Sequence, residues 1–236
     1  MKPTYVGSSS VPADNQGAFE PNVFVLTPPG GLLAGDLVVV CLPIGNPQNA
    51  DAWSIEDDGG QAWGIQYNNM NIATGTMGMR AYACTFNGSW SNNPAFRAAP
   101  TGGKNPASAI MHVFRPPNGF GNWALSTPPG GGYFGQLAAP DYTVNVQGQN
   151  SLHDHAISLA WWHTPTALVW GPPIGAGWSV AGLNQYRNNV NGNKDTSDAF
   201  AYFAHDVAGP SGNVSRNRNA DGVGGAVILT MFASAV

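Results

Sequence analysis

The sequence predicts an all-β chain, a β-sandwich of jelly-roll type with very little helix. Short apolar runs rich in β-branched residues, such as residues 37–42, are bounded by Gly and Pro, which is typical of buried strands. The 31 Gly and 19 Pro residues supply turns between such strands. No apolar stripe with helical spacing runs for about ten residues, so about eight to twelve short strands are expected.

Taken in order, the expected strands are residues 23–26, 37–42, 61–67, 79–86, 107–115, 156–161, 200–204 and 226–232. Gly59-Gly60 predicts positive-φ turn residues before the strand that contains Trp63, and Asn87-Gly88 predicts a tight turn after residue 86. Strand alternation places one set of side chains on a common face, namely Arg80, Tyr82, Cys84 and Phe86.

The chain is expected to consist of an N-terminal arm, residues 1–22, and a single β-sandwich domain, residues 23–236. Thr27-Pro28-Pro29-Gly30-Gly31 recurs letter for letter as residues 127–131. When the second half of the sequence is aligned with the first, its strands follow at similar separations. Residues 156–161 then correspond to 37–42, Trp178 to Trp63, residues 200–204 to 80–84, and residues 226–232 to 109–114. This pattern predicts a degenerate internal duplication, with two halves at about 23–117 and 127–236 joined by residues 120–140.

Charge and hydropathy exclude several classes of protein. Charged residues make up 9% of the chain and the net charge is −4, so no excess of basic side chains is available to neutralise nucleic-acid phosphates. No apolar run approaches the about 20 residues that span a bilayer, and no signal-like apolar segment follows Met1. We therefore expect a soluble chain made without a signal peptide, binding neither nucleic acid nor membrane. Arg216 and Arg218, a close basic pair, are expected to be solvated loop charges.

Two cysteines, Cys41 and Cys84, lie in predicted strands. Buried reduced thiols are the expected state, and a disulfide is the alternative because the distance between them cannot be inferred from the sequence.

His153-Asp154-His155 is the most suggestive cluster for chemistry. Strand alternation would put both imidazoles on one face, with His163 further along it, as in the His-x-His pair of a cupin metal site. A cupin-like metalloenzyme is therefore one alternative, with His205 as the later ligand. Because residues 156–159 contain no carboxylate, we interpret the cluster instead as polar residues at the start of a strand.

Other polar clusters are also interpreted as loops. The alternating oxygens of Asn189, Asn191, Asn193 and Asp195 resemble half of a calcium loop but lack its Gly and closing Glu. Glu56-Asp57-Asp58 has no partner carboxylate at a predictable distance. The common catalytic fingerprints are absent from the sequence, so no catalytic, cofactor-binding or metal-ligating residue is assigned and a non-enzymatic protein is expected.

The tryptophans divide into two groups. Trp63 and Trp178 follow Gly-rich turns at repeat-equivalent positions and are expected to anchor the core, so that replacing either by Ala costs about 3–5 kcal/mol. Trp53 and Trp90 lie among polar turn residues, where they are candidates for exposed platforms that stack on a sugar or anchor a protein partner. The alternative is that they fold back onto the edge of the sandwich.

One pattern resembles β-sandwich structural proteins of tailed bacteriophages. It consists of Gly35-Asp36-Leu37 followed by apolar residues, a Gly-rich turn with Trp63, the strand Arg80-Ala81-Tyr82-Ala83, and the strand from Ala109 to Arg115. The match covers about half of the chain directly and the rest through the repeat. In this sequence Gly60-Gln61-Ala62 stands before Trp63, and the second half has no Gly-Asp.

The resemblance implies a virion component: a head decoration (cement) protein or a tail or fibre part. Its implied partners are the major capsid or tail proteins of the same virion and further copies of itself, for example in a trimer, with the protein on the outer surface of the particle. A carbohydrate-binding adhesion module that takes a host glycan is the alternative.

Overall fold

The computed structural model confirms an all-β sandwich architecture. It describes residues 1–12, 23–45, 54–72, 77–90, 94–97, 108–134, 143–164, 168–182, 186–188, 196–220 and 223–236. Within these ranges the chain forms strands and turns without a helix, and neighbouring strands run antiparallel.

The strands of the first half are β1 (Thr4–Pro12), β2 (Val23–Val25), β3 (Leu37–Gly45), β4 (Ser54–Glu56), β5 (Gly64–Ile72), β6 (Met77–Thr85), β7 (Ala95–Arg97) and β8 (Ser108–Arg115). They form two sheets. The N-terminal inner sheet has the order β1-β8-β3-β6-β5, and the N-terminal outer sheet has the order β2-β7-β4.

The strands of the second half are β9 (Phe120–Phe134), β10 (Thr143–Val146), β11 (Asn150–Ser151), β12 (Ala156–Thr164), β13 (Trp170–Ile174), β14 (Ser179–Val180), β15 (Tyr186–Asn188), β16 (Thr196–Ala204), β17 (Gly209–Pro210), β18 (Val214–Arg218) and β19 (Gly224–Ala235). The C-terminal inner sheet has the order β14-β16-β12-β19-β9, with β15 also paired to β16, and the C-terminal outer sheet has the order β10-β18-β13. A short β11-β17 pair stands apart.

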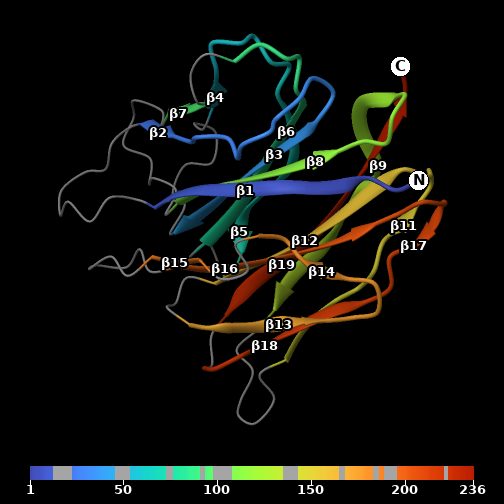
Figure 1. Cartoon of the computed structure of the whole chain (residues 1–236). Coiled ribbons are helices and arrows are strands. Elements are labelled where there is room, and N and C mark those ends of the chain that lie inside the picture. The colour runs from blue at the N-terminus through green and yellow to red at the C-terminus, as the bar shows by residue number, and fades with distance from the viewer. Residues whose placement is uncertain are drawn as a thin grey trace.

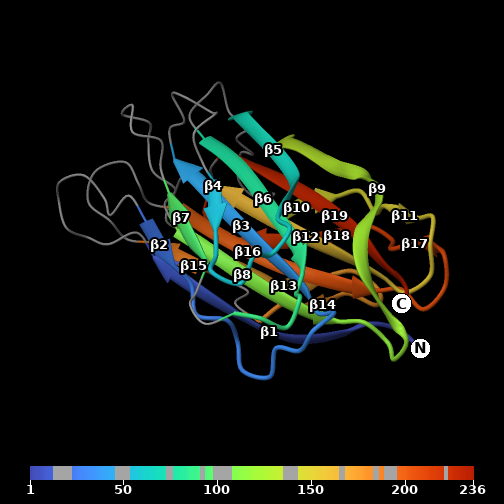
Figure 2. The ribbon, with the colours of Figure 1, turned by 90° about the horizontal axis from the view of Figure 1, so that it is seen from above.

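The four larger sheets stack as four layers, with the two inner sheets face to face (Figure 1). The central layer, between the inner sheets, contains Leu37, Val39, Cys41, Ile157, Leu159 and Trp161 from the middle strands β3 and β12. The N-terminal outer layer packs β2, β7 and β4 over the other face of the N-terminal inner sheet, as the view from above shows (Figure 2). In the C-terminal outer layer, β10, β18 and β13 pack over the other face of the C-terminal inner sheet, around Trp162, Trp170 and Val214.

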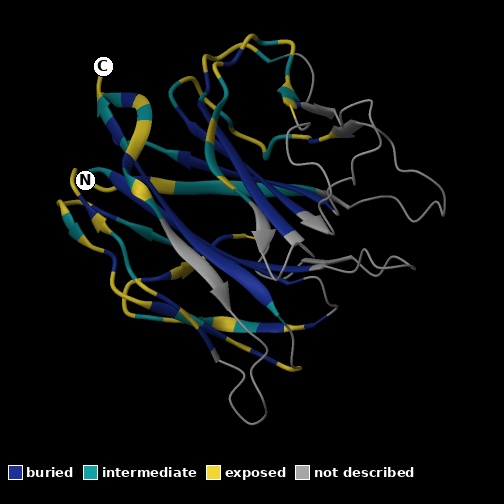
Figure 3. Ribbon diagram, turned by 180° about the vertical axis from the view of Figure 1, so that it is seen from behind, coloured by how far each residue is buried: buried dark blue, intermediate teal, exposed yellow. Residues whose placement is uncertain are grey.

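This stacking explains why β3 has a continuous apolar sequence. In an antiparallel sheet with one solvated face, apolar and polar residues alternate, whereas a strand buried on both faces is apolar throughout. Val38, Val40 and Leu42 point into the N-terminal outer layer and the residues between them point into the central layer. Every residue from Leu37 to Leu42 is at most 1% exposed. Figure 3 shows the same burial along the strands of both inner sheets.

The two halves share one strand order. In the first half β1, β8, β3 and β6 lie side by side over β2, β7 and β4, and in the second half β9, β19, β12 and β16 lie side by side over β10, β18 and β13. Each strand of one set has the same place along the chain as its counterpart in the other. The strand order therefore agrees with the internal repeat that the sequence predicts.

Cross-strand pairing fixes which residues correspond. Val40 pairs with Tyr82 and Met111, and Ala160 pairs with Ala201 and Ile228. All of these face an outer layer. The alignment of the two halves from the sequence matched Tyr202 with Tyr82 and Phe232 with Phe114. It was wrong by one residue, because in the structure Ala201 corresponds to Tyr82 and Met231 to Phe114. A slip of one residue moves a side chain to the opposite face of a sheet.

Irregular features of the backbone recur at the same places. The β1-β8 ladder has a bulge between Tyr5 and Gly7, opposite Phe114 and Val113. The β9-β19 ladder has one between Leu125 and Thr127, opposite the corresponding Met231 and Thr230. Trp63 and Trp178 also correspond, because Ile65 pairs with Tyr82 and Val180 with Ala201.

Two predicted boundaries were wrong. Residues 4–12 are not part of an arm but the edge strand β1, paired with β8 from Arg115 to Ser108, while residues 13–22 lie outside the described residues. Residues 120–134 are not a connection but strand β9, the corresponding edge of the second half. The two halves are therefore residues 4–115 and 120–235, since each inner sheet needs its edge strand to cover the strand beside it.

The literal Thr-Pro-Pro-Gly-Gly repeat has no common structure. Residues 27–31 form the turn between β2 and β3, whereas residues 127–131 lie inside β9, where Gly130 and Gly131 pair with Ile228 and Val227. The strands repeat, and this five-residue match does not.

Candidate functional site

The His153-Asp154-His155 cluster lies in a turn and not on a strand. His155 has φ 54°, which breaks the alternation that would place both imidazoles on one face. His155 Nδ1 lies 2.6 Å from the carbonyl oxygen of Met1, and the His153 ring stacks on Phe232 with ring centroids 3.7 Å apart. His155 also corresponds to Gly35, which has φ 89°. The cluster therefore forms the turn before β12, which corresponds to the turn before β3 in the first half.

His163 is separate from that cluster and fully buried in β12. Its Nδ1 donates to Asp198 Oδ1 at 3.0 Å, and Trp161 Nε1 donates to the same oxygen at 2.7 Å. Neither Asp198 Oδ2 nor His163 Nε2 has a hydrogen-bond partner among the described residues. This polar network joins β12 to β16 inside the core, and it has no opening to solvent because all three side chains are 0% exposed.

His205 is also buried, at the end of β16. Its Nε2 lies 2.9 Å from Ser158 Oγ, which in turn lies 2.8 Å from Thr230 Oγ1. Burial lowers the pKa of His205 to about 4. The histidines of the cupin-like alternative thus lie in three separate environments, and within the described part of the chain no group of three His, Cys, Asp or Glu side chains is arranged to hold a metal ion.

Asp57, from the acidic triplet, organises the turn between β4 and β5. Its Oδ1 accepts from the backbone N–H of Gly59 at 2.8 Å and of Gln61 at 3.3 Å, and its Oδ2 accepts from Trp63 Nε1 at 2.5 Å. Gly60 has φ 67°, as the sequence predicts, whereas the prediction of a positive φ was wrong for Gly59. The carboxylate is therefore committed to holding the turn and its tryptophan.

Arg216 and Arg218 were wrongly expected to be solvated. Both lie in β18 with exposures of 0% and 3%. Arg216 donates from Nη1 to the carbonyl oxygen of Gly171 and from Nη2 to that of Phe200, both at 2.5 Å, and its guanidinium lies 5.3 Å from the centroid of the Trp162 ring. Burial lowers its pKa to about 10. Arg216 therefore links the C-terminal outer sheet to the inner sheet below it.

Asp36 and Arg115 form a pair that sequence reasoning missed. Arg115 Nε donates to Asp36 Oδ1 at 3.0 Å and Arg115 Nη2 to Asp36 Oδ2 at 2.9 Å, while the backbone N–H of Leu33 donates to Oδ2 at 2.8 Å. The signal was present, because Asp36 directly precedes β3 and Arg115 ends the neighbouring antiparallel strand β8. The resemblance motif thus encodes a turn and an ion pair that hold two strands in register.

The tryptophans contribute to packing. Trp178 is buried, with Nε1 donating to the carbonyl oxygen of Ser211 at 3.0 Å, and Trp63 is partly buried on the N-terminal outer layer. Trp90 packs edge-on against Trp63 and tilted against Phe86, so it is not the exposed platform that was one of its expected roles. Trp53 and residues 189–195 lie outside the described residues.

The two cysteines are free, buried thiols on opposite faces of the N-terminal inner sheet. Cys41 points into the central layer and Cys84 into the N-terminal outer layer. Burial raises the pKa of both thiols above the ordinary value, so they are neutral.

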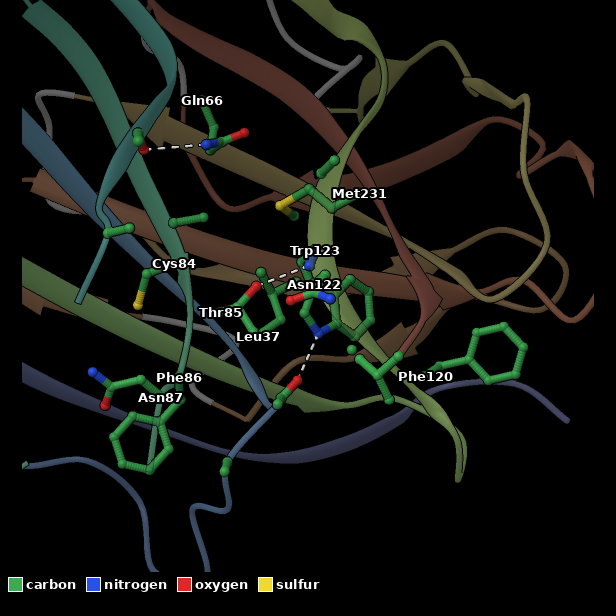
Figure 4. Close-up of a pocket in the computed structure, with 18 of the residues that line it drawn as sticks. Leu37, Gln66, Cys84, Thr85, Phe86, Asn87, Phe120, Asn122, Trp123 and Met231 are labelled. Atoms are coloured by element: carbon green, nitrogen blue, oxygen red, sulfur yellow. Dashed lines mark hydrogen bonds between the residues drawn. The ribbon is translucent and has the colours of Figure 1, made fainter. Parts of the chain in front are cut away.

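A cavity of about 850 Å³ opens where β5 and β6 of the first half approach β9 of the second. We call it the Trp123 cavity. Figure 4 shows Trp123, Thr85, Leu37 and Met231 around its centre and Gln66 and Asn87 further out. Trp123 is fixed in place, because its Nε1 donates to the carbonyl oxygen of Gly35 at 3.0 Å and its backbone N–H donates to Thr85 Oγ1 at 2.8 Å.

Comparisons with models of known protein families, with curated proteins and with solved structures found no match. Over the ranges that the structure describes, no helix has the length and apolar character needed to cross a membrane.

Proposed function

We propose that the chain is a non-enzymatic structural protein of a tailed-phage virion, a capsid decoration (cement) protein or a tail-associated component that acts by protein–protein contact. We further propose that each half is a jelly roll. The observation that carries the proposal is the repeated strand order, four strands (β1, β8, β3, β6) facing three (β2, β7, β4), with the same arrangement in the second half. Jelly rolls of two facing sheets are typical of viral capsid domains, and also of lectins and cupins.

The use of the ionisable side chains supports a structural role over a cupin-like enzyme. Asp198, His163 and His205 are bound to other side chains inside the core, and Asp36 and Asp57 hold turns. Groups committed to internal hydrogen bonds stabilise one conformation and do not face a substrate.

The tip formed by β11 and β17 offers a contact surface. Leu152 and Val207 flank this short strand pair and are 64% and 68% exposed. In the part of the first half that the structure describes, no strand pair corresponds to this tip, and residues 27–31 form a plain turn. Exposed apolar side chains at a protruding tip are suited to packing against a neighbouring subunit.

The test is the composition of purified particles of the virus that encodes the chain. We expect mass spectrometry to find the protein at a fixed copy number and gold-labelled antibodies to mark the particle surface, with hundreds of copies for the head and a handful for the tail. The double variant Leu152→Asp, Val207→Asp should reduce incorporation without lowering the thermal midpoint of the free protein. A gene outside any viral or prophage genome, or particles that lack the protein, would contradict the proposal.

A further inference from the structure

The two halves contact each other at two equivalent places, beside β9 and beside β1, and the Trp123 cavity lies beside β9. The halves meet reciprocally, since Tyr5 and Ser8 of β1 lie against Gly182 after β14, and β9 lies against β5, the strand that corresponds to β14. Such an arrangement is that of a pseudo-two-fold interface, in which each contact occurs twice. The space beside β9 therefore has a counterpart beside β1.

Beside β1 the counterpart space is filled by aromatic rings. Tyr5 stacks on Tyr202 with ring centroids 5.2 Å apart and tilts against Phe114 at 5.2 Å. The residues that correspond to Tyr5, Tyr202 and Phe114 are Leu125, Ala83 and Met231, by the ladder partners given above. Ala83 and Met231 line the Trp123 cavity. The cavity is thus the space that a tyrosine fills on the opposite side of the molecule.

The lining selects an uncharged ligand. None of the residues that line the cavity has a charged side chain. Phosphates and carboxylates would lose their hydration without gaining an ionic partner, which is unfavourable.

The lining also combines apolar and amide groups. Leu37, Ala83 and Met231 give apolar surface and Trp123 gives an aromatic ring, while Gln66 further out and Asn122 beside Trp123 bring amide groups (Figure 4). Asn122 has φ 49°, a left-handed conformation that Asn tolerates better than most residues, where β9 borders the cavity. Sugar rings have apolar C–H faces that pack on aromatic rings and hydroxyl edges that bond to amides.

We propose that the Trp123 cavity binds a neutral oligosaccharide, with a sugar ring against Trp123 and its hydroxyl groups bonded to Gln66 and Asn122. The volume lies in the range of small-ligand sites, about 300–1,000 Å³. This site differs from the loop tryptophans Trp53 and Trp90 and does not depend on the proposed virion role.

The experiment uses the full chain and four neutral trisaccharides as probes: cellotriose, maltotriose, mannotriose and N,N′,N″-triacetylchitotriose. Saturation-transfer difference NMR is measured for each, followed by titration of the tryptophan fluorescence. We expect at least one probe to bind and the Ala83→Tyr variant, which places in the cavity the residue found at the corresponding position, to weaken that binding at least tenfold.

Tyr202→Ala is the matched control, because it opens the corresponding space on the other side and should leave sugar binding unchanged. Gln66→Ala carries the test if Ala83→Tyr fails to fold, since residue 66 lies at the rim and its substitution should weaken binding while preserving the thermal midpoint. The proposal is overturned if none of the four trisaccharides and no neutral glycan on an array binds. Binding that both cavity variants leave unchanged would overturn it as well.

Discussion

Arg216 shows how a single residue departs from what composition suggests. A lone basic pair in a polar stretch was expected to be solvated, yet the strand β18 carries Arg216 into a layer where its guanidinium bonds to two carbonyl oxygens over Trp162. Whether an arginine on a strand points to solvent or to a second sheet depends on the layer that packs against that strand. The residues near Arg216 in the sequence do not indicate which layer that is.

We expect Arg216→Ala to lower the free energy of unfolding by about 2–4 kcal/mol, because it removes the two hydrogen bonds that the guanidinium donates to carbonyl oxygens and leaves a void beside Trp162. Arg216→Lys should recover part of this loss, since one ammonium group cannot reach both oxygens with the geometry of a guanidinium. Urea unfolding measures both. Ser215→Ala, on the same strand but partly exposed, should change stability by less than about 0.5 kcal/mol. Equal effects at residues 215 and 216 would contradict the assigned role.

His112 gives a prediction about pH. Burial lowers its pKa from 6.5 to about 3 in the folded chain. Between these values the unfolded chain binds a proton that the folded chain does not, so the free energy of unfolding decreases as pH falls below about 6.5, by about 1.4 kcal/mol per unit from this group. His112→Leu should therefore reduce the loss of stability between pH 6.5 and pH 5 by about 2 kcal/mol in urea titrations.

Phe114→Leu serves as the control for His112, because it perturbs the same aromatic contacts with Tyr5 without removing a titratable group. It should lower stability equally at both pH values. A His112→Leu variant with an unaltered pH slope would show that this imidazole is not the group that resists protonation.

At the scale of the element, the middle strand of each inner sheet follows a turn with one left-handed residue. Gly35 occupies it before β3 and His155 before β12. The backbone hydrogen bond from Phe86 N to the carbonyl of Asp36 recurs as that from His205 N to the carbonyl of Ala156. The second half thus keeps the turn without the Gly-Asp pair, so the geometry persists where the residue motif does not.

Replacing Gly35 by Ala isolates the cost of this conformation. Nothing lies within 4 Å of an added Cβ at Gly35, so only the φ of 89° opposes the change, and we expect a loss of about 1–2 kcal/mol. Gly30→Ala is matched, because an added Cβ there also meets nothing within 4 Å and the residue is not held at positive φ. Thermal melting of the two variants should differ accordingly. A Gly35→Ala protein as stable as Gly30→Ala would refute the argument.

The corresponding tryptophans should differ in their effect on stability. Trp178→Ala should cost about 3–5 kcal/mol, since the ring is buried in the C-terminal outer layer and its Nε1 bonds to Ser211. Trp63→Ala should cost less, about 2–3 kcal/mol, because that ring is only partly buried. Chemical denaturation checks both. An unchanged melting temperature for Trp178→Ala would disprove its role as an anchor.

At the scale of the whole molecule, the two halves are held together by the central layer. Phe114, Trp161 and Phe200 are all fully buried in it, although they come from different halves. We expect a protease site inserted at the exposed Asn118-Gly119 turn to be cut without separating the halves, because each would otherwise expose its inner apolar face to water. Size-exclusion chromatography after cleavage should give a single species of unchanged mass. Two separate soluble halves would contradict a shared core.

The fold class was predictable because strand and turn signals are local. The apolar runs of β3, β8, β12 and β19, the turns at Gly59-Gly60 and Asn87-Gly88, and the common face of Tyr82, Cys84 and Phe86 all follow from spacing and residue type. The candidate site was not predictable. Trp123 and Ala83 lie far apart in sequence, and each is an ordinary residue in its own segment.

The sequence by itself determined that the chain is all-β, where eight of its strands lie and that its two parts resemble each other, because alternation, apolar runs and turn residues act within a few positions. Only the tertiary structure decided which face of each doubly buried strand meets the other half, that Arg216 and His163 are enclosed, and that a space filled by Tyr202 on one side is open beside Ala83 on the other. An apolar residue is favourable on either face of a buried strand, so its sequence does not distinguish them, and the choice is made by the packing of layers far apart along the chain.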